Sequence, residues 1–216
     1  MNRRTCEPAG IEKNASKRRE SSAQRPLVIL ARAELLAMTA WCSATAVAPA
    51  LAAEWRLDDA GTAWLTLAVQ LGFVAGTLAA ALLNLADRIP AVRLFAASAF
   101  AAAAATALVP LLSPGFTAAV ALRVITGAAL AGVYPVGMKL AAGWTRAGRG
   151  WGIGLLVGAL TVGSGVPHLL PLAGDPAAWQ AVLYLAASLT AAGGIVAAVW
   201  IREGPYAGPA PPFQWR

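Results

Sequence analysis

The sequence is poor in charged residues and in cysteine. Asp, Glu, Lys and Arg make up 12% of its 216 residues, about half of the roughly 25% found in soluble domains. Its two cysteines, Cys6 and Cys42, cannot build a disulfide framework or a cysteine-based metal cluster. The sequence also lacks the G-x-x-x-x-G-K-[ST], T-V-G-Y-G and H-E-x-x-H motifs. These absences argue against P-loop nucleotide-binding proteins, potassium channels and zinc proteases of that type, and we expect no cofactor and no metal.

Long apolar stretches take the place of the missing charge. The hydrophobic fraction is 58%, and an apolar helix of about 20 residues is long enough to cross a bilayer. Segments free of Asp, Glu, Lys and Arg run from Leu35 to Ala53, Ala60 to Ala86, Leu94 to Leu122, Val124 to Met138, Gly150 to Gly174 and Pro176 to Ile201. The sequence therefore predicts an all-α polytopic membrane protein with six transmembrane helices.

Basic residues gather on one side of the predicted spans. That side includes the N-terminal segment and holds most of the lysines and arginines, whereas the opposite side holds only Arg56. Because Lys and Arg in short loops stay in the cytoplasm, we expect both termini there. This topology accounts for the net charge of +7 without a nucleic-acid partner. We expect a multi-pass protein of a bacterial-type cytoplasmic (inner) membrane, in contact with the lipid bilayer.

Polar segments flank the predicted membrane bundle. Residues 1–26 are predicted to be a disordered basic leader, residues 27–202 the six-helix bundle, and residues 203–216 a Pro-rich cytoplasmic tail. Two alternatives concern the start of the chain: residues 48–53 resemble a signal-peptidase site, and Arg18-Arg19 resembles a twin-arginine signal. Both are less favoured, because the polar leader is long and five more apolar segments follow the first.

One charged side chain falls inside a predicted span. Arg123 lies seven residues after Phe116, about 10 Å along the fourth helix, and a charge at that depth must be paired or hydrated. The spans hold no acidic residue away from their ends. Arg123 should therefore meet backbone carbonyls, water, an anionic substrate or a carboxylate from elsewhere. Thr126 and Tyr134 share its helical face, and we interpret the three side chains as a substrate cavity, with simple bracing of the bundle as the alternative.

The loop after the second span carries charges of both signs. Asp87 ends the span, where the helix dipole disfavours an acid, so we expect it to pair with Arg88 or Arg93, or to face the N-terminus of another helix. Opposite charges at a membrane face suit a gating latch, and a loop that only sets topology is the alternative. Glu34, also near the cytoplasmic surface, and Arg32, two residues before it, are interpreted as interfacial anchors.

Glycines recur at four-residue spacing on two of the spans. Gly72 and Gly76 lie on the second, and Gly150, Gly154 and Gly158 lie on the fifth. Such spacing allows close approach of helix backbones in lipid. Both faces are therefore predicted to pack against partner helices, within the bundle or beyond it.

Three segments resemble signatures of the major facilitator superfamily. Leu85-Ala86-Asp87-Arg88, followed by Arg93, is similar to its loop between helices two and three. Arg123-Val124-Ile125-Thr126-Gly127 resembles its R-x-x-Q-G element in helix four, with threonine in place of glutamine. Gly163-Ser164-Gly165-Val166-Pro167 is a looser match to its glycine-proline motif in helix five.

The resemblance implies a fold and a function. Members of that superfamily have two six-helix halves, each built of two inverted three-helix repeats, and bind substrate between the halves. It implies a half-bundle that moves a small solute by alternating access, with Arg123 binding an anion or coupling to protons and with Asp87, Arg88 and Arg93 as the gate. Such a half needs a second six-helix half or a homodimer mate, and we favour a truncated product over a working homodimer.

Two other function classes remain open. The six spans, residues 55–56 in the first outer loop, Ser164 and the sole histidine, His168, superficially resemble rhomboid intramembrane serine hydrolases. In rhomboids, however, the base lies on a separate helix from the serine. The other class is a non-transporting membrane assembly subunit. We expect no enzymatic activity.

Overall fold

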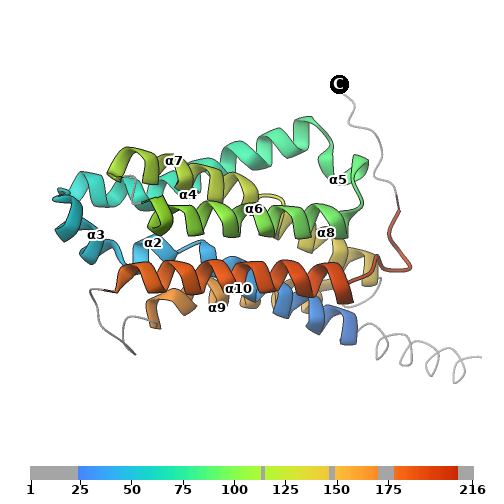
Figure 1. Cartoon of the computed structure of the whole chain (residues 1–216). Coiled ribbons are helices and arrows are strands. Elements are labelled where there is room, and N and C mark those ends of the chain that lie inside the picture. Colours follow the sequence, from blue (N-terminus) through green and yellow to red (C-terminus); the bar gives the residue numbers. More distant parts are fainter. Residues whose placement is uncertain (1–23, 113–114, 146–148, 170–177, 209–216) are drawn as a thin grey trace, which may run out of the picture.

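The structure, a computed structural model, is all-helical over the residues it describes, which are 24–112, 115–145, 149–169 and 178–208 (Figure 1). This confirms the all-α prediction. Five helical segments in these ranges are long and apolar enough to cross a membrane. They are α4 (Asp59–Leu82), α6 (Ala91–Leu112), α7 (Gly115–Leu130) continued by α8 (Tyr134–Trp144), α9 (Arg149–Leu169) and α10 (Trp179–Trp200). The predicted count of six spans is not confirmed.

The helix of the first predicted span is interrupted. A helix over residues 24–37 is followed by η1 (Met38–Ala40), α2 (Ser43–Ala46) and α3 (Ala48–Trp55). Turns at 41–42 and 47 separate these pieces, and Pro49 lies in the first turn of α3, where its missing N–H does no harm. A continuous helix, as the apolar run alone suggested, does not form here.

The fourth predicted span is also broken. α7 ends at Leu130, residues 131–133 form a turn, and α8 starts at Tyr134 with Pro135 in its first turn. Gly115, the first residue of α7, has a φ of 74°, which suits glycine.

The helices pack in a definite order. α4 lies along α7, α7 along α6, and α6 along α10, while η1 contacts both α9 and α10. The start of the helix over 24–37, α5 (Leu85–Arg88) and the end of α10 lie at one end of the bundle, and α3 lies at the other (Figure 1). The first and last described segments thus lie at the same end of the bundle.

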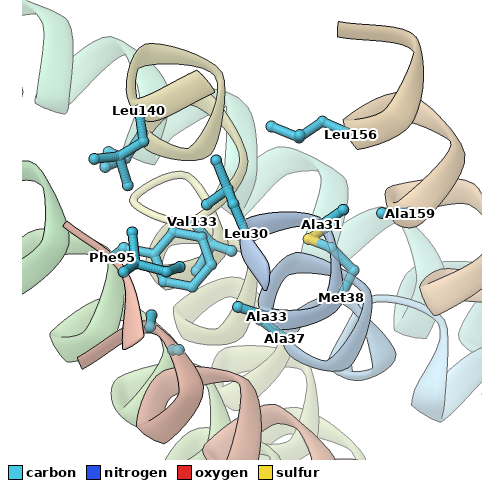
Figure 2. Close-up of a cluster of buried hydrophobic side chains, with 14 of the residues drawn as sticks. Leu30, Ala31, Ala33, Ala37, Met38, Phe95, Val133, Leu140, Leu156 and Ala159 are labelled. Carbon is cyan, nitrogen blue, oxygen red and sulfur yellow. The ribbon is translucent and has the colours of Figure 1, made fainter. Parts of the chain in front are cut away.

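A buried apolar cluster surrounds the helix over residues 24–37. Figure 2 shows Leu30 of that helix pointing toward Phe95, Val133 and Leu140, while Leu156 of α9 faces its other side. A second cluster includes Val47, Leu51 and Leu183. The first segment therefore lies inside the bundle, with other helices on several sides of it.

Candidate functional site

Arg123 of α7 is fully enclosed and bonded to the interrupted first segment. Its side chain is 1% exposed. Nη1 donates to the carbonyl oxygen of Ala40 at 3.0 Å and to Oγ of Ser43 at 3.2 Å. Nη2 donates to the carbonyl oxygen of Trp41 at 2.5 Å. The guanidinium therefore joins the middle of α7 to the break between η1 and α2.

The break in the first segment explains why the buried guanidinium of Arg123 can be accommodated beside it. Carbonyl oxygens at the end of a helix lack the regular intrahelical donor, and the turn at residues 41–42 ends η1 beside Ala40 and Trp41. A fork of N–H donors on one planar group can satisfy several such oxygens at once. Of the partners expected for Arg123, the structure supplies backbone carbonyls and a hydroxyl. No described acidic residue forms an ion pair with it.

The other two predicted cavity residues do not join this network. Thr126 is buried and donates its hydroxyl to the carbonyl of Leu122, one turn earlier in its own helix, at 2.9 Å. Tyr134 is half-buried at the start of α8 and packs against the first apolar cluster. Among the described residues no hydrogen bond joins Tyr134 to Arg123 or Thr126. Arg123 and Thr126 are neighbours on α7 and Tyr134 belongs to the next helix.

The predicted gating loop has a partner that the sequence did not indicate. Asp87 of α5 forms an ion pair with Lys139 of α8, at 2.5 Å between Oδ1 and Nζ. Lys139 also donates to the carbonyl of Ala86 at 2.6 Å. The expected pairing of Asp87 with Arg88 or Arg93 is therefore wrong in this conformation. Both arginines are exposed, and neither forms an ion pair within the described residues.

This pairing follows from topology. Lys139 was assigned to the cytoplasmic side as one of the basic residues that set orientation, and Asp87 to the same side as the end of the second span. α5 and α8 both lie at that end of the bundle (Figure 1). Sequence could place both charges on one face of the membrane but not choose among the basic residues there.

The glycines of the second span pack inside the bundle. A Cβ on Gly72 would lie 2.1 Å from the carbonyl oxygen of Val124, and one on Gly76 would lie 2.6 Å from that of Ala128. Gly127 of α7 reciprocates, because its Cβ would lie 1.9 Å from the carbonyl oxygen of Val69. Only glycine permits α4 and α7 to approach this closely. Their partner is α7 of the same chain.

The glycines of the fifth span lie on an open face. A Cβ on Gly150, Gly154 or Gly158 would have no heavy atom of another element within 4 Å. Trp151 and Val157 on the same helix are exposed, at 52% and 41%. This face of α9 is therefore free of contacts within the described chain.

Glu34 is buried, contrary to its interpretation as an interfacial anchor. It is 0% exposed, and neither carboxyl oxygen has a hydrogen-bond partner among the described residues. The sequence signal that could have found it is the run of apolar residues on both sides, Leu27 to Ala31 and Leu35 to Ala37, broken by Arg32 alone. Arg32 is exposed whereas Glu34 is not, which is consistent with the opposite faces expected for two residues so spaced.

The residues of the hydrolase alternative do not form a catalytic pair. Ser164 donates its hydroxyl to the carbonyl of Thr161, in its own helix, at 3.0 Å. His168 is exposed on the same helix, and no hydrogen bond joins the two within the described chain. A nucleophilic serine needs a base within hydrogen-bonding reach, so the geometry does not favour hydrolysis.

Residues after α10 bind back across the same end of the bundle. Trp144 Nε1 of α8 donates to the carbonyl of Arg202 at 3.0 Å, and the backbone N–H of Tyr206 donates to the carbonyl of Gly143 at 3.0 Å. A carboxylate oxygen of Glu203 accepts from the N–H of Ala91, the first residue of α6, at 3.1 Å. The ends of three membrane helices, α6, α8 and α10, are therefore tied together.

Comparison with known proteins gives one match. A family model described as Major Facilitator Superfamily matches residues 33–216, which covers every transmembrane segment described above. A comparison with curated proteins found no match.

Proposed function

This chain belongs to the major facilitator superfamily, and we propose that it is a six-helix half of a transporter that moves a small solute by alternating access. The observation that carries the proposal is the family match across the whole membrane portion. Two contacts support it: Arg123 joins α7 to the first segment, and Asp87 joins α5 to α8. Both involve segments that resemble the signatures of this superfamily.

We further propose that the working transporter contains a second half. Substrate sites in this architecture lie between two halves. Support comes from α9, whose glycine face meets nothing in the described chain. A second copy of this chain and a separate six-helix half are both compatible with that face, and the membrane is proposed to be a bacterial-type cytoplasmic membrane with both termini inside.

The charge of the solute has less support than the transport function. An anionic cargo was inferred from Arg123 as a cavity residue, but two of its three guanidinium nitrogens are bonded to carbonyls and a hydroxyl of the same chain. A residue so engaged braces two helices. An anion would need to displace those contacts, so we leave the charge of the solute out of the proposed function.

Uptake into proteoliposomes tests the proposal. The purified chain should give saturable uptake of a labelled solute from a panel of sugars, amino acids and organic anions, above that of empty liposomes. Arg123→Ala should reduce uptake of every solute that the wild type carries, because the helix brace is lost. Loss of anion uptake alone would restore the anionic-cargo interpretation, and no uptake of any panel member with or without a coexpressed second half would contradict the transport function.

Cysteine cross-linking identifies the second half. In a background with Cys6→Ser and Cys42→Ser, a cysteine at Gly154 places a thiol on the open face of α9. Disulfide-linked dimers of the chain in native membranes would indicate a homodimer. A matched variant with cysteine at Ser98, on α6, should not cross-link, since that half-buried side chain packs against Gly132 of the same chain.

A further inference from the structure

Glu34 is the one acidic side chain among the described residues that is completely buried. Its exposed fraction is 0%, whereas the other described acids, Glu54, Asp58, Asp59, Asp87 and Glu203, are exposed. Both carboxyl oxygens of Glu34 lack a hydrogen-bond partner there. The bracing contacts of Arg123 and the latch at Asp87 do not use this group.

The carboxyl of Glu34 lies against a surface without side chains. A Cβ on Gly137 of α8 would be 2.7 Å from Oε2 of Glu34, so glycine at 137 provides the space that the carboxyl occupies. The backbone on either side is equally enclosed. The carbonyl oxygen of Ala33 would be 2.6 Å from a Cβ on Gly193 of α10, and that of Leu35 would be 2.2 Å from one on Gly163 of α9. Three helices thus enclose the backbone and carboxyl around this residue.

Buried apolar side chains lie one turn before and one turn after Glu34. Leu30 and Met38, about one helical turn before and after Glu34, are each 1% exposed and belong to the first apolar cluster. In Figure 2 they lie among Val133 of the α7–α8 turn and Leu156 and Ala159 of α9. Leu156 Cδ2 would also lie 3.6 Å from a Cβ on Gly137. The carboxyl is therefore enclosed between helices, beside Gly137 and Leu156.

No positive charge in the described chain compensates for Glu34. On the elements packed against it the titratable residues whose side chains are described are Tyr134 and Lys139 of α8, His168 of α9 and Tyr184 of α10. His168 and Tyr184 are exposed, and Lys139 is committed to Asp87 and the carbonyl of Ala86. Arg32, on the same helix as Glu34, is exposed. None of these groups forms an ion pair with Glu34.

An ionised carboxylate without a partner in an apolar environment is so costly that such a group takes up a proton instead. We propose that Glu34 is a proton-binding site that holds a proton in this conformation and can release it only when the helix over 24–37 separates from α8. On binding, one proton from water forms an O–H bond with a carboxylate oxygen and neutralises the group. On release, the carboxylate forms again and needs water beside it.

This proton site gives the half a means of coupling. Because the neutral form fits the packed arrangement and the charged form does not, protonation favours contact between the helix over 24–37 and Gly137, and ionisation favours an opened arrangement. The role in driving solute movement rests on the transport function proposed above. The proton site itself does not, since it follows from the burial and surroundings of one side chain.

Infrared difference spectroscopy of the reconstituted full chain tests the site without a solute. At neutral pH the wild type should show a carbonyl stretch of a protonated carboxylic acid that moves to lower frequency in D₂O and disappears in Glu34→Gln. Glutamine has nearly the shape of the neutral acid, so this variant should keep its fold. Asp59→Asn, which removes an exposed acid of α4, should keep the band. Absence of the band in the wild type, or its persistence in Glu34→Gln, would overturn the proposal.

Glu34→Asp provides a second variant, because it retains the acid on a shorter side chain. A protonated-acid band should remain but at an altered frequency, which separates loss of the group from loss of the fold.

Hydrogen–deuterium exchange then tests whether deprotonation of Glu34 opens the contact between the helix over 24–37 and α8. After correction for the intrinsic effect of pH, exchange in residues 24–37 and α8 should rise at alkaline pH in the wild type and not in Glu34→Gln. Equal behaviour of the two proteins would reject the link to opening even if the infrared band is present.

Discussion

The guanidinium of Arg123 binds the carbonyl oxygen of Ala40, at 3.0 Å between Nη1 and O, and so connects two membrane segments that are 83 residues apart in the sequence. Two more bonds, to Ser43 and Trp41, fix the same contact. The first segment is interrupted at this point, and α7 supplies the donors that a continuous helix would otherwise provide. Loss of this one side chain should therefore affect both segments.

Arg123→Leu should lower stability. The change leaves the carbonyl of Trp41 without its donor, at about 1–3 kcal/mol for an unsatisfied group. The carbonyl of Ala40 keeps only the hydroxyl of Ser43, at 2.9 Å, and removal of a buried charge offsets part of the cost. We expect a net loss of about 2 kcal/mol, measured by thermal unfolding in detergent. Arg32→Leu, which removes an exposed arginine of the first segment, should change stability little. Equal effects of the two variants would show that the bonds of Arg123 contribute no special stability.

Gly127→Ala should separate α4 from α7. The added methyl group would lie 1.9 Å from the carbonyl oxygen of Val69, and overpacking of this kind costs about 1–3 kcal/mol. Gly158→Ala is the matched control on α9, where a Cβ meets nothing within 4 Å and alanine should favour the helix by about 0.5–1 kcal/mol. Thermal stability of the single chain should fall for the first variant and hold or rise for the second. A large loss for Gly158→Ala would mean that this face is covered.

Lys139→Gln should loosen α5. The ion pair with Asp87 is about one-third exposed on each side, at 35% and 34%, and pairs of this kind contribute about 0–1 kcal/mol. Global stability should thus change little, while amide exchange of Leu85 to Arg88 should increase. The charge swap Asp87→Lys with Lys139→Asp should restore slow exchange, and Arg88→Gln should leave it unchanged. If Arg88→Gln had the larger effect, the pairing originally expected from the sequence would be correct.

Thr190→Val should weaken the contact between α10 and η1. Thr190 Oγ1 lies 3.1 Å from Thr39 Oγ1 and 3.3 Å from the carbonyl oxygen of Ala37. Interhelical hydrogen bonds of side chains in membranes contribute about 0.6 kcal/mol on average, and a loss of that size should appear as a modest drop in unfolding temperature. Ser188→Ala removes a hydroxyl that bonds only within α10, to the carbonyl of Tyr184, and should leave the unfolding temperature unchanged. A drop as large for Ser188→Ala would remove the interhelical explanation.

The sequence predicted the helical fold and most of the span positions because apolar runs of this length have one stable form in lipid. It could not predict the interruptions at 41–42 and 131–133, since these depend on partners such as Arg123 and on where Pro135 falls in a turn. It identified Arg123 as a charge that needed a partner. The identity of that partner depended on the break in another helix, which hydropathy does not record.

The sequence also could not predict which single polar residues are buried. Glu34 and Arg32 differ by two positions, and sequence assigned both to the interface; the structure buries one and exposes the other. The difference arises because Gly137, Gly163 and Gly193 let three helices close around one face only. A pattern of glycines is visible in the sequence, but which glycine meets which helix depends on tertiary packing.

The bonds of residues 202–206 to α6 and α8 have a mechanical consequence. At that end of the bundle α6, α8 and the segment after α10 are joined by hydrogen bonds of the Trp144 indole, the Glu203 carboxylate and the Tyr206 backbone N–H, so these helices cannot separate there without breaking several bonds together. At the opposite end the described residues supply a hydrogen bond from Trp179 Nε1 of α10 to Glu54 of α3 and an edge-to-face contact between Trp179 and Trp55, which join two helices instead of three. When this half bends, the hydrogen-bonded end should therefore act as the hinge, and the helix ends on the other side of the membrane should move most.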